Sequence, residues 1–262
     1  PWMTLSYGNP VWGGDFRLGM RVSQVTENPE AFAAWLRYVE AVVARYKDVI
    51  DEWEVWNEPF DQTGHYMKLL IETAKVVKRV QPTAKCICTA IQWRGSPEKS
   101  EYKVILDELK RTNQLNLVDR WVFHPYWGNP DDANEEADAL GRLVRSYSPD
   151  YEEMQGETGC PSQLEYAHAL AEEEWTEYAQ AKWDLRRAMG DAARGRRSNV
   201  FSFIDLQYTF MLQSFGLVRS NALKEPVYRR PSYFAMQTVY ALFDDTVKPL
   251  GFKRLHVNGR RF

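Results

Sequence analysis

The stretch Glu52-Trp53-Glu54-Val55-Trp56-Asn57-Glu58-Pro59 decides how the rest of the chain is interpreted. Its large apolar residues predict a buried β-strand from Ile50 to Asn57, which the proline ends. The strand finishes by presenting an amide and a carboxylate side by side, at Asn57 and Glu58. Such a pair suits acid/base chemistry on a hydroxylated substrate such as a sugar.

A second strand-like run ends in another glutamate. Tyr151 to Gln155 leads into Gly156-Glu157-Thr158-Gly159, where the two glycines leave room around the carboxylate. Glu157 follows Glu58 by 99 positions. Only a fold that returns distant strand ends to one place brings these side chains together, and a parallel barrel does so.

Composition sets the broad class of the protein. With 262 residues and 44% hydrophobic content, the chain can bury a full core as one large α/β domain. A net charge of −3 provides no basic surface, so nucleic acid is not expected as a partner. No apolar run is long enough to span a membrane. A neutral or weakly charged substrate fits this composition best.

Aromatic residues and cysteines add two further indications. The chain has ten Trp and fourteen Tyr; most such rings pack in cores, but sugar-binding clefts also use flat aromatic platforms. Three cysteines do not form a disulfide framework, and Cys86 and Cys88 share one face of a predicted strand, where they are poorly placed to bridge. The chain starts at Pro1, either processed or cut from something longer. The compartment stays open, with a secreted or periplasmic location slightly favoured.

Strands and helices are expected to alternate along the chain, beginning with a strand at Trp2 to Gly8 and a Gly/Pro-rich loop at Asn9 to Asn28. Further strands are predicted at Ile50 to Asn57, Ala84 to Ile91, Val118 to His124, Glu152 to Glu157 and Asn199 to Asp205. Helices are predicted at Pro29 to Tyr46, His65 to Val80, Glu101 to Arg111, Asn134 to Tyr147 and Pro231 to Phe243, with one long or broken helix at Glu165 to Met189. Asn28 is a good N-cap and Pro29 suits the first helical position.

The spacing of the strands is as informative as their order. Strand ends fall near residues 58, 92, 125 and 157, and such a spacing matches a βα unit of roughly 30 residues. The fold class predicted is therefore a (β/α)₈ TIM barrel. Only six strands can be counted, so the barrel is expected to be incomplete, with its first two βα units absent from the chain.

The domain organisation follows from this count. Residues 1–245 are expected to form the catalytic barrel with strands three to eight. Residues 246–262 are expected to begin an accessory β-strand region, with short strands at Thr246 to Leu250 and Phe252 to Asn258.

The two glutamate motifs resemble the retaining glycoside hydrolases of clan A. Trp56-Asn57-Glu58-Pro59 is similar to the clan's acid/base motif at the end of the fourth strand, and Gly156-Glu157-Thr158-Gly159 is similar to the nucleophile motif at the end of the seventh. If Asn199 to Asp205 is the eighth strand, Glu58 and Glu157 fall on the fourth and seventh. The strand count and the resemblance agree.

The two ends of the chain resemble family 39 of that clan most, with family 5 next. The similar segments are Tyr7-Gly8-Asn9-Pro10, Phe215-Gly216-Leu217-Val218-Arg219 and Arg230-Pro231-Ser232-Tyr233-Phe234-Ala235. The resemblance implies an enzyme that hydrolyses O-glycosidic bonds of a poly- or oligosaccharide by double displacement, without a cofactor or metal. A β-xyloside or a related β-glycoside is the first guess for the substrate.

The resemblance also assigns roles to particular residues. Glu157 would be the nucleophile and Glu58 the acid/base, about 5 to 5.5 Å apart as in retaining enzymes generally. Asn57 would bind the sugar 2-hydroxyl. In Phe123-His124-Pro125-Tyr126-Trp127, Tyr126 would hydrogen-bond Glu157, while His124 either lines the same subsite or is a structural histidine.

Further binding residues are expected at the mouth of the barrel. Trp93 and Trp127 follow strands and either stack on a sugar face or pack on the rim. Weaker candidates lie near the first and last strands: Tyr7, Asn9, Trp12, Asp205 and Tyr208. Glu54, Glu152 and Glu153 lie within or before strands, where a polar barrel floor or a salt bridge is the commoner explanation.

Two other functions remain open at this stage. A non-catalytic carbohydrate-binding barrel, or an inactive fragment of a glycosidase, would keep the fold without the activity. A metal-dependent hydrolase is disfavoured because the four histidines are scattered and form no His-x-His pattern. The oligomeric state cannot be read from the sequence.

Overall fold

The computed structural model describes residues 1–12, 21–59, 63–91, 99–208, 211–244, 246–250, 256–257 and 260–261. The chain divides into two compact units. The first contains Pro1–Phe123 and Glu136–Met154, and the second contains His124–Glu135 and Gln155–Phe262. Each unit has its own apolar core.

A five-stranded sheet forms the centre of the first unit. Its strands are β1 (Trp2–Leu5), β2 (Glu52–Val55), β3 (Lys85–Cys88), β4 (Arg120–Phe123) and β5 (Glu152–Gln155), paired in this order. The pairings from β1 to β4 are parallel. This confirms the predicted alternation and its parallel sheet, since parallel neighbours need a crossover helix between them. Closure into a barrel is not seen among the described residues and stays a prediction.

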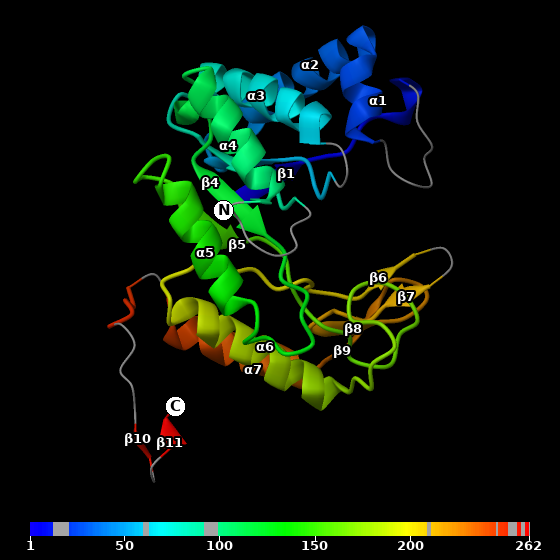
Figure 1. Ribbon diagram of the computed structural model, residues 1–262. Helices are drawn as coiled ribbons and strands as arrows, with labels where there is room; N and C mark the ends of the chain where they lie inside the picture. The colour runs from blue at the N-terminus through cyan, green and yellow to red at the C-terminus, as the bar shows by residue number, and fades with distance from the viewer. Residues whose placement is uncertain are drawn as a thin grey trace. The chain divides into compact units, whose positions relative to one another are not determined.

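Helices alternate with these strands along the chain. They are α1 (Val22–Glu27), α2 (Pro29–Tyr46), α3 (Thr63–Val80), α4 (Glu101–Arg111) and α5 (Asn134–Arg145), with short 3₁₀ turns η1 (Pro10–Trp12) and η3 (Leu115–Leu117). Figure 1 shows α2, α3 and α4 side by side over the sheet. The predicted cap of α2 is confirmed, because the side chain of Asn28 accepts hydrogen bonds from Glu30 N at 2.9 Å and Ala31 N at 3.2 Å.

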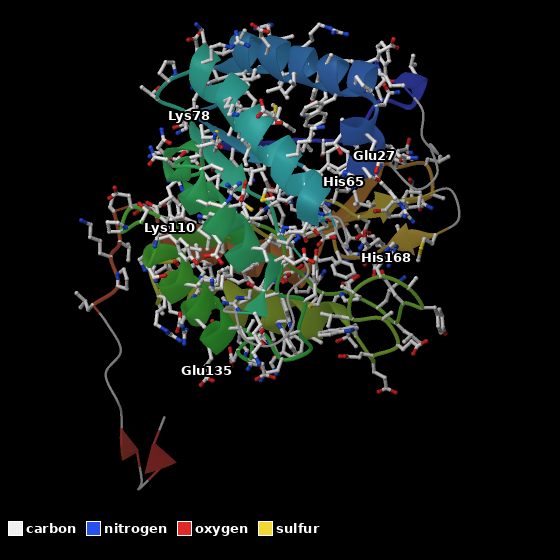
Figure 2. The ribbon with its side chains drawn as sticks, turned by 45° about the horizontal axis from the view of Figure 1, so that its top comes forward. Glu27, His65, Lys78, Lys110, Glu135 and His168 are labelled. Carbon is white, nitrogen blue, oxygen red and sulfur yellow. The ribbon has the colours of Figure 1, made fainter. Side chains whose placement is uncertain are left out.

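The helix α1 was not expected, since its residues lie within the loop predicted from Asn9 to Asn28. Buried Val22 and Val25 hold one face of it against the core. The imidazole of His65, on α3, contacts the last two residues of α1. Its Nδ1 lies 2.9 Å from Thr26 Oγ1, and its Nε2 lies 3.3 Å from Glu27 (Figure 2). These are tertiary contacts, and a six-residue helix without a side-chain N-cap shows little local signal.

The core of the first unit is rich in large aromatic side chains. Trp53, Trp121, Tyr66 and Tyr102 are all fully buried. Both tyrosine hydroxyls are hydrogen-bonded: Tyr66 Oη donates to Val55 O at 3.1 Å, and Tyr102 Oη to Val122 O at 2.6 Å. Because both acceptors belong to sheet residues, the rings also tie α3 and α4 to the strands. Much of the aromatic excess therefore serves as packing.

The second unit consists of two packed helices and short hairpins. Its helices are α6 (Glu177–Ala192) and α7 (Pro231–Leu242). Its hairpins pair β6 (Leu206–Gln207) with β7 (Leu212–Gln213), β8 (Val218–Ser220) with β9 (Pro226–Arg229), and β10 (His256–Val257) with β11 (Arg260–Arg261). Figure 1 shows α6 and α7 lying along each other. The small apolar cluster of Ala188, Leu217, Met236 and Val239 joins α6 and α7 to the residue just before β8.

The prediction of one long or broken helix from Glu165 to Met189 is wrong over its first half, which is not helical. The helix α6 begins only after Thr176, whose side chain accepts a hydrogen bond from Ala179 N at 3.1 Å. Before it, His168, Leu170 and Glu172 have φ of 73°, 59° and 65°. Left-handed residues cannot continue a right-handed helix, so this segment forms turns instead.

The prediction of a sheet strand from Asn199 to Asp205 is also wrong, because this segment does not join the five-stranded sheet. Among the described residues it forms a single isolated bridge, between Ile204 and Val218. Its backbone bonds elsewhere: Phe201 N donates to Thr158 O at 2.8 Å, and Ser202 N to Phe215 O at 3.2 Å. These contacts with loops take the place of a strand ladder.

The C-terminal predictions are partly wrong. Thr246 to Leu250 is exposed and forms no strand, because it has no buried face to alternate with. Of Phe252 to Asn258, His256–Val257 is strand β10 and the other residues lie outside the described part of the chain. The predicted domain boundary between residues 245 and 246 stays a prediction. Within the described residues, no helix combines the length and the apolar character needed to cross a bilayer.

Candidate active site

The end of β2 carries the first candidate carboxylate in an unusual backbone conformation. Trp56 has φ of 68° and Glu58 has φ of 46°. Left-handed conformations of non-glycine residues cost on the order of 1–3 kcal/mol each, and they cluster at functional sites. Asn57 and Glu58 are half-buried, whereas Val55 and Trp56 are buried. The strand thus ends in two consecutive polar side chains at the boundary between core and solvent.

A tyrosine on the neighbouring strand end holds Asn57. The Asn57 Nδ2 donates to Tyr7 Oη at 3.0 Å. The Tyr7 ring meets the Trp56 indole edge-to-face, with centroids 5.5 Å apart, and Trp56 in turn contacts Trp35 at 5.4 Å. The first unit therefore brings two predicted binding residues, Tyr7 and Asn57, to the backbone that bears Glu58.

The glutamates that were expected to be structural have structural partners. Glu54 accepts hydrogen bonds from Thr4 Oγ1 at 3.0 Å and Thr89 Oγ1 at 2.8 Å, inside the sheet. Glu152 pairs with Arg120 at 2.8 Å, and Glu153 pairs with Arg145. Each carboxylate contributes to packing or to an ion pair, in agreement with the sequence interpretation.

The second candidate carboxylate lies in the second unit, just after β5. Tyr126 Oη donates a hydrogen bond to Glu157 Oε1 at 2.6 Å, so the predicted contact is confirmed. Next to it, Thr158 Oγ1 donates to Pro125 O at 2.7 Å. The segment with His124 and Tyr126 and the segment with Glu157 are thus joined by two side-chain hydrogen bonds. His124 is half-buried.

Gly159 is required by a close approach of two backbones. A Cβ atom at this position would lie 1.9 Å from Phe201 O. The neighbouring Phe201 N donates to Thr158 O at 2.8 Å, which fixes the two segments against each other. The sequence suggested that Gly159 leaves room around the Glu157 carboxylate. In the structure, Gly159 instead allows the close approach of the Phe201 backbone.

We expect Gly159→Ala to destabilise the protein by at least 2 to 3 kcal/mol, because overpacking against backbone usually costs about 1–3 kcal/mol and no flexible side chain can yield here. The matched control is Gly64→Ala in α3, where an added Cβ meets nothing within 4 Å. That change should raise stability by roughly 0.5 kcal/mol. Urea unfolding midpoints measure both, and equal midpoints for the two variants would contradict the prediction.

Two aromatic side chains near Glu157 were not recognised as a pair from the sequence. Burial and the negative charge of Glu157 raise the pKa of Tyr208. The His168 ring stacks on Tyr208, with centroids 5.4 Å apart and an interplanar angle of 29°. Tyr208 was only a weak candidate. His168 was missed because it lies in the stretch mistaken for a helix.

Asp205 has a structural set of partners. Its oxygens accept bonds from Arg230 at 2.6 and 2.9 Å, from Gly216 N at 3.0 Å and from Ser220 N at 3.0 Å. Asp205 and Arg230 are both buried, so the pair fixes the hairpin to the start of α7. This favours a structural role over the predicted contact with substrate.

The remaining candidates are placed as follows. Trp127 is 45% exposed, and its carbonyl accepts a hydrogen bond from Trp183 Nε1 at 2.9 Å. Asn9 is exposed, and its side-chain oxygen accepts from Val11 N at 3.0 Å. Trp93 lies outside the described residues.

Comparisons with known proteins concern the fold. No protein-family model matches the chain, and no curated protein matches it either. Among solved structures, a family GH2 β-galacturonidase from Eisenbergiella tayi matches with a TM-score of 0.60 and 13% identity, over 85% of this chain and 39% of that one. A β-D-glucuronidase from Dictyoglomus thermophilum matches with a TM-score of 0.57 and 15% identity, over 80% and 36%.

A β-glucuronidase from Ruminococcus gnavus is similar to the same extent, with a TM-score of 0.55 and 15% identity, over 80% of this chain and 35% of that one. This chain therefore spans well under half the length of each of these three structures. At this identity the likeness shows the α/β fold, which these glycosidases share with the chain.

Proposed function

We propose that this chain is the catalytic part of a retaining glycosidase, with Glu157 as nucleophile and Glu58 as acid/base. The observation that carries the proposal is the hydrogen bond of 2.6 Å from Tyr126 to Glu157, which holds a strand-end carboxylate in one orientation. The glycosidase neighbours that share the fold support it, and so does the strained backbone around Glu58.

The topology of the sheet supports a pairing of the two carboxylates. β2 and β5 belong to one sheet, and each glutamate follows the last residue of its strand within three positions. In parallel α/β folds, catalytic side chains gather at the carboxyl ends of the strands. We infer that Glu58 and Glu157 act on one sugar as the two carboxylates of a retaining enzyme.

The proposed reaction has two steps. In the first, a Glu157 oxygen attacks the anomeric carbon while Glu58 gives its proton to the departing oxygen, so the glycosidic bond breaks and a glycosyl ester forms. In the second, Glu58 takes a proton from water, whose oxygen displaces Glu157 from the anomeric carbon. The Tyr126 hydroxyl stabilises the carboxylate before the attack and when it leaves. Asn57, oriented by Tyr7, would hold the sugar 2-hydroxyl.

The substrate proposed is a β-glycoside in a poly- or oligosaccharide. A β-xyloside, expected from the resemblance to family 39, is one candidate. A β-linked uronic acid is the other, since three similar structures are a galacturonidase and two glucuronidases. His124 and Trp127 would line the sugar site in either case, and Trp93 remains a candidate from the sequence.

Covalent trapping tests the proposal directly. The full chain is incubated with a panel of 2-deoxy-2-fluoro-β-glycosyl fluorides, xylosyl and glucuronosyl among them, and its mass is measured. We expect a mass increase of one fluorosugar, on the peptide that contains Glu157, and none in Glu157→Gln. Absence of labelling with every sugar would instead favour the alternative, a barrel that binds carbohydrate without cleaving it.

We expect Tyr126→Phe to lower kcat on an aryl β-glycoside roughly 10- to 100-fold, because a hydrogen bond to a charged group contributes about 1.5–3 kcal/mol. The fold should be unaffected, since the ring can still pack against Phe215. Tyr178→Phe, at an exposed position of α6, is the control and should keep wild-type kcat. An unchanged kcat in Tyr126→Phe would remove the residue from the proposed site.

A further inference from the structure

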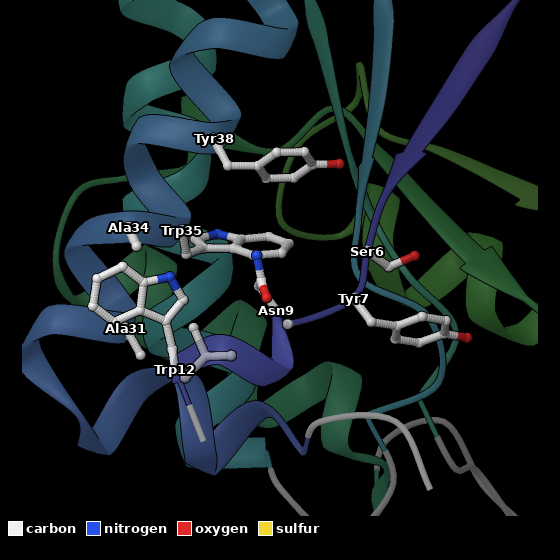
Figure 3. A pocket seen from close by; sticks show the side chains of 10 residues that line it. Ser6, Tyr7, Asn9, Trp12, Ala31, Ala34, Trp35 and Tyr38 are labelled. Carbon is white, nitrogen blue, oxygen red and sulfur yellow. The ribbon is translucent and has the colours of Figure 1, made fainter. Parts of the chain in front are cut away.

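The first unit contains a pocket that the proposed chemistry does not use. It has a volume of about 290 Å³ and lies between the segment after β1 and the first half of α2 (Figure 3). Its walls include Asn9, Trp12, Trp35 and Tyr38. Of the described residues that line it, none is charged. The size is at the lower limit of small-molecule sites, which start at about 300 Å³.

The walls of the pocket combine aromatic rings with amide and hydroxyl groups. Figure 3 shows the Tyr38 ring next to the Trp35 indole, and Trp12 approaching from another segment. The centroids of Trp35 and Tyr38 are 5.5 Å apart. Asn9 and Ser6, both from the segment after β1, also line the pocket.

This chemistry matches one class of ligand. The apolar face of a pyranose ring packs on aromatic rings, while its hydroxyls bond with amides and hydroxyls. A charged ligand would lose its hydration without an opposite charge among the described lining residues, at a considerable cost in free energy. A purely apolar ligand would make no hydrogen bond with the polar side chains of Asn9 and Ser6, both of which belong to lining residues.

Two side-chain contacts connect the wall of the pocket with the strand end that carries Glu58. Tyr7 contributes to the pocket wall, yet its ring points away from Trp35 and Tyr38, and its hydroxyl accepts the hydrogen bond from Asn57 at 3.0 Å. A second connection runs from Trp35 to Trp56, 5.4 Å apart. A ligand in the pocket would therefore lie one side chain away from Asn57.

We propose that this pocket is a further carbohydrate subsite, which binds an uncharged sugar ring of the same oligosaccharide whose bond is cleaved beside Glu58. The link to cleavage rests on the proposed function, whereas sugar binding in the pocket does not. The subsite predicts a substrate of several sugar units and a preference for chains with an uncharged ring at this position.

Binding measurements on the full chain with Glu157→Gln, which prevents turnover, test the subsite. Calorimetry compares a ladder of β-1,4-xylo-oligosaccharides and cello-oligosaccharides, from two to six units, with the methyl β-glycosides of single sugars. We expect Tyr38→Ala to raise Kd for the longer chains about tenfold by loss of stacking, and to leave single sugars unchanged. Tyr38→Phe should keep Kd within about twofold, since the ring remains.

Tyr46→Ala is the matched control. It lies on the same helix and is 39% exposed, compared with 40% for Tyr38, but it does not line the pocket. It should bind every oligosaccharide as the parent protein does, and melting temperatures establish that all variants are folded. Equal Kd values for the parent and Tyr38→Ala along the whole ladder would overturn the subsite, and so would a parent protein that binds no member of it.

The two proposals fail in different ways. If Glu157 is not labelled by any fluorosugar but Tyr38→Ala still weakens only the longer chains, the subsite stands and the catalytic role falls. If Glu157 is labelled and Tyr38→Ala binds normally, the catalytic role stands and the subsite falls.

Discussion

Replacing Glu157 with glutamine should lower kcat by roughly 10⁴-fold, which corresponds to about 5 kcal/mol in activation free energy. The amide has the shape of the carboxylate and can still accept the hydrogen bond from Tyr126, but it is too weak a nucleophile to form the glycosyl ester. The measurement is kcat on an aryl β-glycoside with a good leaving group. Substrate binding should be retained, because the geometry of the site is kept.

A variant with a smaller side chain at position 157 adds a test of stereochemistry. Glu157→Ala with azide should yield a glycosyl azide of inverted configuration, since the small anion attacks from the side that the carboxylate occupied. Glu174→Gln, an exposed position of the second unit, controls for loss of charge and should remain fully active. A Glu157→Gln enzyme with more than a tenth of wild-type kcat would exclude this residue as nucleophile.

The effect of replacing Glu58 should depend on the leaving group. Glu58→Ala removes the proton donor, so hydrolysis of substrates with poor leaving groups should fall about 10²- to 10⁴-fold, the usual contribution of general acid catalysis. The dinitrophenolate of a dinitrophenyl β-glycoside leaves without being protonated. Glu58→Ala should therefore still form the glycosyl ester from this substrate at a rate near that of the wild type. Pre-steady-state release of dinitrophenol measures this step separately from hydrolysis of the ester.

The control for this prediction is Glu40→Ala. Glu40 lies on the surface of the same unit and pairs with Arg79 at 2.9 Å, a contact of small energetic value. Glu40→Ala should keep wild-type activity on substrates with good leaving groups and on substrates with poor ones. An equal loss of Glu58→Ala activity on good and poor leaving groups would rule out the acid/base role.

Much of the first unit could be predicted because its signals are local. Asn28 and Pro29 mark the start of α2, and the predicted limits of α4, Glu101 and Arg111, are those of the structure. Caps and helical periodicity depend on residues within a turn or two of each other. Strand ends were predicted two to three residues too far in several places, because the limit of a strand is set by its ladder hydrogen bonds, which the side-chain pattern does not specify.

The segments from 165 to 176 and from 199 to 205 were mistaken for a different reason. Charged and apolar residues near Glu165 imitate a helical period, but Glu165 itself is buried and accepts hydrogen bonds from Ser214. Phe201 looks like a strand residue, but its backbone bonds to Thr158. In both segments a contact over more than 40 positions overrides the local pattern.

By itself, the sequence determined the order of strands and helices in the first unit and the position of Glu58 and Glu157 just after two strands. Those features follow from periodicity, caps and short motifs, which neighbouring residues specify. Only the tertiary structure decided that Tyr126 donates a hydrogen bond to Glu157, that Arg230 pairs with Asp205, and that Gly159 is needed for a close backbone contact. The physical reason is that these contacts join residues 25 to 42 positions apart in the sequence, and packing rather than local propensity selects them.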